Sequence, residues 1–133
     1  MTILRTIFAM FMCILELTLL TPLMFLEKAR KRSGDPLRLS KREKSVQKIV
    51  KAWAKSVLFF SGVTVTVTGL EHIPKSPAVF VGNHQGYFDI ITLLGAMDKC
   101  RAFVGQAGFQ KVPFLNGWME NLDCVFINRE NPR

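Results

Sequence analysis

An apolar segment near the amino terminus, residues 7–26, constrains the fold more than any other feature of this chain. It spans twenty residues and contains one charged residue, Glu16. At about 1.5 Å per residue, a helix of this length reaches roughly 30 Å, the thickness of a bilayer's hydrocarbon core. A straight spanning helix is disfavoured because a carboxylate is costly at mid-membrane unless it is paired or protonated, and because Pro22 kinks a helix. We therefore expect a membrane-embedded helix and leave open whether it crosses.

Positive charge is concentrated directly after this segment. Residues 28–55 contain eleven Lys or Arg against Asp35 and Glu43, a balance of +9 in a chain of net charge +8. A nucleic-acid-binding protein would spread such charge over a folded face with interleaved aromatic residues, so we expect no nucleic-acid partner. One basic block beside an apolar segment is typical of contact with an anionic membrane surface. If the segment spans, the block places the rest of the chain on the cytoplasmic side.

A second helix is predicted over residues 40–60. Lys44, Lys48, Lys51 and Lys55 recur at spacings of 4, 3 and 4 and form one stripe, and an apolar face that includes Trp53 lies opposite. One interpretation is an ordinary surface helix whose apolar face packs on a core. Lysines aligned opposite a Trp-containing face favour the other interpretation, an interfacial membrane helix. Residues 1–60 are therefore predicted to form a membrane-associated helical region.

Residues 61–133 are predicted to form an α/β domain. Valine alternates with threonine over residues 63–68, which predicts a strand with one buried face, and residues 78–82 form a short apolar run typical of a buried strand. Further strands are predicted at residues 101–105 and 124–127, with helices at residues 89–97 and 113–121. Strands that alternate with short helices indicate an α/β architecture.

The segment over residues 81–90, Val-Gly-Asn-His-Gln-Gly-Tyr-Phe-Asp-Ile, contains the candidate catalytic residues. It joins a predicted strand to a predicted helix, the junction at which α/β sheets generally bind ligands. Across a tight turn, Asp89 could accept a hydrogen bond from one imidazole nitrogen of His84 and leave the other free to take a proton. Gly86 would permit a sharp turn and close substrate approach. Spacing alone leaves two alternatives open, because an Asp at a helix start is commonly a capping residue and a lone His is commonly a hydrogen-bonded polar group.

Cysteine gives no sign of a metal site. Cys13, Cys100 and Cys124 are widely separated and show no metal-ligand spacing. Free thiols in a reducing compartment are expected, with no bound metal.

Three ordered blocks resemble the glycerophospholipid acyltransferase family, which includes the 1-acylglycerol-3-phosphate acyltransferases. NHQGYFDI, over residues 83–90, looks like the family's His-x4-Asp signature. KVPFLNGWM, over residues 111–119, is similar to its Pro-aromatic-Gly-Trp block, and CVFINRENPR, over residues 124–133, resembles its Phe-Ile-Asp-Arg strand. The basic two-helix region also looks like the family's membrane-docking element. The resemblance therefore implies a docking element followed by the first half of the family's α/β sheet domain.

The resemblance also implies roles for individual residues. His84 would be the general base on an acceptor hydroxyl and Asp89 its orienting partner, with acyl-CoA or acyl-carrier protein as the thioester donor. Arg129 matches the family's arginine for the acceptor's phosphate, and Asn83 and Gly86 would belong to the substrate-binding loop. The implied reaction acylates a lysophospholipid such as 1-acylglycerol-3-phosphate in phospholipid biosynthesis, without a cofactor.

Several positions depart from the family pattern. Gly86 stands where a Ser is usual, and Asn128 replaces the Asp beside Arg129. Gln106 and Gly108 stand where many members have Lys and Glu. The family's downstream Glu-Gly-Thr-Arg block does not occur in these 133 residues. This last departure suggests a truncated product, and it raises the alternative of a noncatalytic membrane- or lipid-binding protein of the same lineage.

Overall fold

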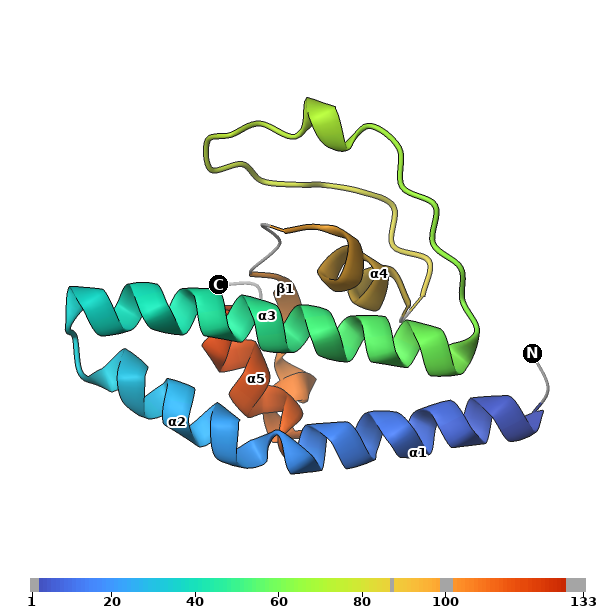
Figure 1. The fold of residues 1–133 in the computed structure, drawn as a ribbon, viewed down its shortest axis with the longest axis horizontal. Coiled ribbons are helices and arrows are strands. Elements are labelled where there is room, and N and C mark those ends of the chain that lie inside the picture. Colours follow the sequence, from blue (N-terminus) through green and yellow to red (C-terminus); the bar gives the residue numbers. More distant parts are fainter. Residues whose placement is uncertain (1–2, 87, 99–101, 129–133) are drawn as a thin grey trace.

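Three long helices form the amino-terminal body of the protein, which a computed structural model describes over residues 3–86, 88–98 and 102–128. They are α1 (Ile3–Leu19), α2 (Thr21–Arg32) and α3 (Pro36–Ser61). Figure 1 shows α1 and α2 following one another along one side of α3, which runs back along both of them. The two expected helical segments are therefore packed against each other.

The predicted kink in the apolar segment is confirmed. The helix breaks at Leu20, and α2 restarts with Pro22 in its first turn, at an angle of 47° to α1. Proline has no N–H to donate and its ring clashes with the preceding turn, so it is tolerated at a helix start and not in the interior. Within the described residues no single helix is long and apolar enough to cross a membrane, whereas α1 and α2 together meet the requirement as a bent pair.

Helix α3 begins four residues earlier than predicted, because residues 33–36 contain a helix start. The Asp35 carboxylate accepts hydrogen bonds from the backbone N–H groups of Leu37, at 2.8 Å, and Arg38, at 3.3 Å. Pro36 occupies the first helical turn, where its fixed φ suits the helix. The helix ends at Gly62, whose φ of 67° is in the left-handed region that favours glycine.

The apolar face of α3 lies in the hydrophobic core, which corrects the prediction that this face contacts a membrane. Val46, Val50 and Ala54 are 3%, 6% and 0% exposed, and they pack with residues of α2 and of the carboxyl-terminal part. The surface-helix interpretation is therefore the right one for α3. The lysine stripe lies outside this core, with Lys44, Lys48 and Lys55 exposed. Periodicity identified the face but could not identify what covers it.

The carboxyl-terminal part contributes short elements that pack on α3 and α2. They are α4 (Phe88–Ala96), β1 (Val104–Gln106), the 3-10 helix η2 (Ala107–Lys111), α5 (Leu115–Asn121) and β2 (Val125–Ile127). The strands β1 and β2 pair in parallel, with Gly105 opposite Phe126. Of these, α4, β1, α5 and β2 were predicted to within three residues at their starts, whereas η2 was not predicted. Leu94, Trp118 and Leu122 complete the core that α2 and α3 begin.

The other two predicted strands, at residues 63–68 and 78–82, are not formed, which corrects the sequence-based prediction. Residues 62–86 leave the body as a long excursion on the side of α3 opposite α1, with the 3-10 helix η1 (Leu70–His72) at its far end (Figure 1). Val79 and Val81 are 90% and 93% exposed. A strand exists only where a neighbouring strand takes its backbone hydrogen bonds, and the described residues provide no such neighbour for either segment. The molecule is therefore mostly helical, with a two-stranded parallel sheet.

Candidate active site

His84 and Asp89 meet where the long excursion returns to the body and α4 begins. The Nδ1 atom of His84 lies 2.9 Å from Oδ2 of Asp89. Asp89 is in the first turn of α4, a helix that packs on α3. The side chains are 65% and 36% exposed, respectively, so solvent reaches the pair. The contact predicted from the sequence is thus present.

One carboxylate oxygen of Asp89 holds the loop together. Besides His84, its Oδ2 atom accepts hydrogen bonds from the backbone N–H of Gln85, at 2.6 Å, and of Gly86, at 3.0 Å. In return the N–H of Asp89 donates to the carbonyl of Gly86 at 3.1 Å. The backbone N–H groups of Gly86 and Gln85, followed by His84, hold the pKa of Asp89 below its usual value, because each favours the charged carboxylate.

This arrangement orients the imidazole of His84. An ionised Asp89 fixes the imidazole by taking the hydrogen bond of Nδ1, so the neutral ring carries its proton there and keeps Nε2 as the basic atom. Asp89 lies in the first turn of α4, but the N–H groups of Gln85 and Gly86 that donate to it precede the helix, so the structure supports the orienting interpretation and not that of a helix cap. The two backbone donors were not identified from the sequence.

The remaining loop residues have different surroundings from those expected. Gly86 does not adopt a left-handed φ, and a Cβ atom added there would meet nothing within 4 Å. The turn therefore does not require glycine, which corrects one part of the prediction, while the open space leaves room for a substrate. Asn83 is exposed directly beside His84. Arg129, the predicted phosphate-binding residue, lies outside the described residues.

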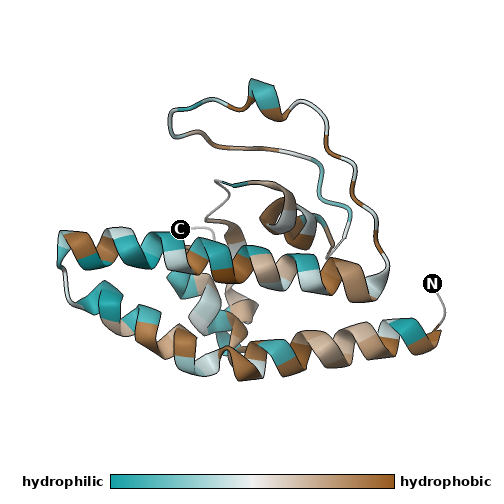
Figure 2. Cartoon of the chain, in the orientation of Figure 1, coloured by the Kyte–Doolittle hydropathy of each residue, from teal (hydrophilic) through white to brown (hydrophobic). Residues whose placement is uncertain are grey.

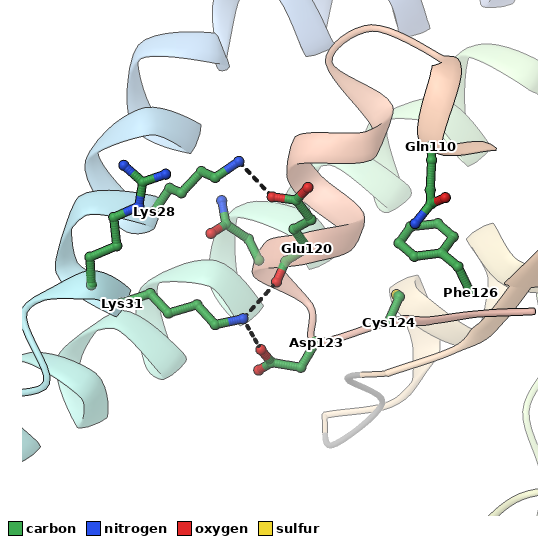
Figure 3. Close-up of a pocket in the computed structure, with 9 residues that line it drawn as sticks. Lys28, Lys31, Gln110, Glu120, Asp123, Cys124 and Phe126 are labelled. Carbon is green, nitrogen blue, oxygen red and sulfur yellow. Dashed lines mark hydrogen bonds and ion pairs between the residues drawn. The ribbon is translucent and has the colours of Figure 1, made fainter. Parts of the chain in front are cut away.

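A cavity beside α2 and α5 is separate from this pair. It has a volume of about 620 Å³ and is lined by residues of α2, η2, α5 and β2, including neither His84 nor Asp89. Figure 3 shows Lys28 and Lys31 of α2 reaching Glu120 and Asp123 across it. Both ion pairs have Nζ–O distances of 2.5 Å, so the lysines of this cavity are already paired with carboxylates. In the part of the chain that the structure describes, no three His, Cys, Asp or Glu residues are grouped to hold a metal.

Comparison with known proteins identifies one family. The family model described as Acyltransferase matches residues 64–133, more than half of the chain, including the His84–Asp89 loop. No solved structure matches the chain.

Related proteins are named as 1-acyl-sn-glycerol-3-phosphate acyltransferases. The chain is 36% identical over 87 residues to the chloroplastic 1-acyl-sn-glycerol-3-phosphate acyltransferase of Arabidopsis thaliana, covering 64% of this chain and 24% of the relative. It is 32% identical over 97 residues to a probable 1-acyl-sn-glycerol-3-phosphate acyltransferase of Mycoplasma genitalium, and the match covers 69% of this chain and 34% of the relative. A probable 1-acyl-sn-glycerol-3-phosphate acyltransferase from Mycoplasma pneumoniae is 31% identical over 80 residues, which cover 57% of this chain and 30% of the relative. The chain thus spans about a quarter to a third of the length of these relatives.

Proposed function

Because the chain belongs to the Acyltransferase family, we propose that it acts in the transfer of an acyl group to the free hydroxyl of a 1-acyl-sn-glycerol-3-phosphate-type acceptor. The observation that carries the proposal is the 2.9 Å contact between His84 and Asp89 on an open loop. The names of the relatives support the acceptor, a lysophospholipid used in phospholipid synthesis.

The proposed reaction is a direct transfer. Nε2 of His84 removes the proton of the acceptor hydroxyl as its oxygen attacks the thioester carbonyl. The carbon–sulfur bond then breaks, the imidazolium returns the proton to the departing thiolate, and an ester and a free thiol remain. A base is needed because an alcohol is a poor nucleophile, whereas the thioester already has a good leaving group. Asp89 stabilises the imidazolium that forms during the transfer.

The donor in this scheme is a thioester, either acyl-CoA or an acyl-carrier protein, and no metal or cofactor takes part. Arg129 would hold the acceptor's phosphate, since a guanidinium can donate two parallel hydrogen bonds to it. Asn83, which is exposed beside His84, would contact a substrate entering the loop. The reaction would take place on the cytoplasmic side of a membrane, in keeping with the basic block over residues 28–55.

A second candidate function is lipid or membrane binding without turnover. The observation that favours it is the exposure of the site, because His84 is 65% exposed and does not line the cavity beside α2 and α5. A base accelerates transfer when the acceptor is held in attack geometry, and an open loop does this poorly.

A thiol-release assay separates the two functions, and the chain offers a matched control. His72, the other histidine, is exposed on η1 and contacts Glu71. With 1-acylglycerol-3-phosphate present, His84→Ala should lower the rate of thiol release from acyl-CoA or acyl-carrier protein by about 10²–10⁴-fold. His72→Ala should leave the rate unchanged.

Each outcome of this assay is informative. Equal loss in both variants, or no loss in His84→Ala, would contradict the mechanism. If the unaltered protein released no thiol in an acceptor-dependent manner but bound lipid vesicles, the second function would replace the first.

A further inference from the structure

The lysine stripe of α3 is a continuous, positively charged face of the protein. It comprises Lys44, Lys48, Lys51 and Lys55, and Lys41 extends it by about one turn. At 3.6 residues per turn and 1.5 Å per residue, the five side chains lie within about 80° of arc over a length of about 21 Å. Figure 2 shows hydrophilic colour recurring along α3. The stripe is therefore a long and narrow basic surface.

Most of this charge has no partner within the described part of the chain. Lys51 is half-buried and donates to Oδ1 of Asp98, two residues after α4 ends. Among the residues that the structure describes, Lys41, Lys44 and Lys48 form no ion pair, and all three are exposed. Like charges three or four residues apart on a helix repel one another. Carboxylates of a binding partner would remove that repulsion.

The stripe borders the helix that carries half of the candidate active site. Lys55 packs against α4, because a Cβ atom added at Gly95 would lie 3.8 Å from the Cγ atom of this lysine. Asp89 is in the first turn of the same helix, which has nine residues and is about 13 Å long. A donor held on the stripe is therefore separated from the His84–Asp89 contact by about the length of α4.

We infer that the lysine stripe is the docking surface for a protein that carries the acyl thioester, an acyl-carrier protein whose contacting face is acidic. The inference rests on the proposed acyl transfer and names its donor as a protein-bound thioester. Carboxylates at helical spacing on the carrier match lysines that recur every three or four residues along α3. Complementary charge of this kind steers the encounter and fixes the orientation of the carrier.

The shape and composition of the stripe favour a protein over other anionic partners. The nucleotide of acyl-CoA would need a concave site, whereas the stripe follows one convex helix, and the cavity beside α2 and α5 includes none of its lysines. An interfacial membrane helix inserts apolar side chains beside its basic ones. In α3, which the structure describes throughout, the exposed large apolar side chains are Leu37 and Phe59, beyond the two ends of the stripe. The stripe itself therefore offers charge without an apolar surface to insert.

A triple substitution tests the docking surface. Lys41→Gln, Lys44→Gln and Lys48→Gln together remove three exposed charges and leave the ion pair of Lys51 in place. An exposed ion pair changes affinity by a few-fold, so the triple variant should raise the Kd for acyl-carrier protein about tenfold. This difference should shrink as the salt concentration rises. Lys111→Gln, which removes an exposed lysine at the end of η2, is the control and should leave the Kd unchanged.

Binding is measured separately from the proposed reaction. Both sets of variants are made in the His84→Ala background, in which the proposed mechanism allows no acyl transfer, and their affinity for acyl-carrier protein is compared. Carbodiimide cross-linking then locates the contact, because it joins a lysine amine to a carboxylate paired with it. Peptide mapping should place the links to the carrier at Lys41, Lys44 or Lys48.

The outcomes separate this inference from the proposed function. Links confined to lysines outside the stripe, or equal affinity of the triple variant and the protein with an intact stripe, would overturn the inference. An unaltered protein that binds no carrier protein but releases thiol from acyl-CoA would also overturn it and leave the proposed function intact. Binding of the carrier through the stripe without acyl transfer by the unaltered protein would support the docking surface and contradict the proposed function.

Discussion

The helical body and the excursion over residues 62–86 differ in what their apolar residues contact. Val50 in α3 is 6% exposed, whereas Val81 in the excursion is 93% exposed. Both occur in apolar patterns: one predicted the apolar face of an amphipathic helix, and the other predicted a buried strand. A helix satisfies its own backbone hydrogen bonds, so α3 forms and then finds a partner for its apolar stripe. A strand cannot do so, and its burial depends on another strand.

The two residues of the candidate site lie on either side of this difference, one in the packed body and one in the exposed excursion. Asp89 belongs to α4, which the body holds through the packing of Gly95 against Ala54 and Leu58. His84 belongs to the excursion and is attached mainly through Asp89 itself. Asp89 is thus placed by the packing of α4 and His84 by its hydrogen bond to Asp89, so the site should respond to changes in the loop without loss of the fold.

Core truncation should have the largest effect on stability. Trp118 is 4% exposed and packs with Met24 and Val50, so Trp118→Ala removes a large buried side chain and should lower the free energy of unfolding by about 3–5 kcal/mol. Val81→Ala should change it by less than about 0.5 kcal/mol, because exposed side chains contribute little. Urea denaturation followed by circular dichroism in detergent micelles measures both. Similar losses in the two variants would mean that residues 78–82 are buried in solution.

Substitution of glycine by alanine should also destabilise the body more than the excursion, by a smaller amount than the core truncation. A Cβ atom at Gly117 of α5 would lie 2.2 Å from Sδ of Met24, so Gly117→Ala forces α5 and α2 apart and should cost about 1–3 kcal/mol. The flexible Met24 side chain keeps the cost within this range. At Gly86 the added Cβ meets nothing within 4 Å, and Gly86→Ala should change stability by less than about 1 kcal/mol. The same denaturation experiment applies, and a larger loss at Gly86 than at Gly117 would contradict the packing described.

Much of the helical body could be predicted from the sequence. Periodicity located α3, Pro22 located the break before α2, and the short elements α4, β1, α5 and β2 followed from local patterns. What covers each apolar face could not be predicted, because amphipathicity is the same for a helix on a core and a helix on a membrane. The face of α3 was therefore assigned to a membrane, although it lies in the core, and the strands at residues 63–68 and 78–82 were predicted without a neighbour.

For the candidate site, the His84–Asp89 contact was predicted because five residues across a turn bring the two side chains together. The backbone N–H donors of Gln85 and Gly86 were not predicted, because every residue except proline has an N–H group and the sequence does not show which of these groups point at a carboxylate. The ion pairs of Lys28 and Lys31 with α5 and its following turn join residues about ninety positions apart, beyond the reach of any local pattern.

The smallest expected effect is the titration of Asp89 itself. Its pKa is lowered in the folded protein, chiefly by the N–H groups of Gly86 and Gln85, so the unfolded chain binds the proton more readily. The stability that this charge contributes to the loop is therefore present above the unfolded pKa of about 3.9 and lost as the pH falls through the lower folded value. NMR shifts of the Gln85 and Gly86 amides, followed from pH 7 downward, should titrate with a midpoint below 3.9, and Asp89→Asn should abolish that titration. A midpoint at or above 4 would mean that the two amides do not hold the carboxylate in solution. The loop would then depend on the His84 contact for its shape.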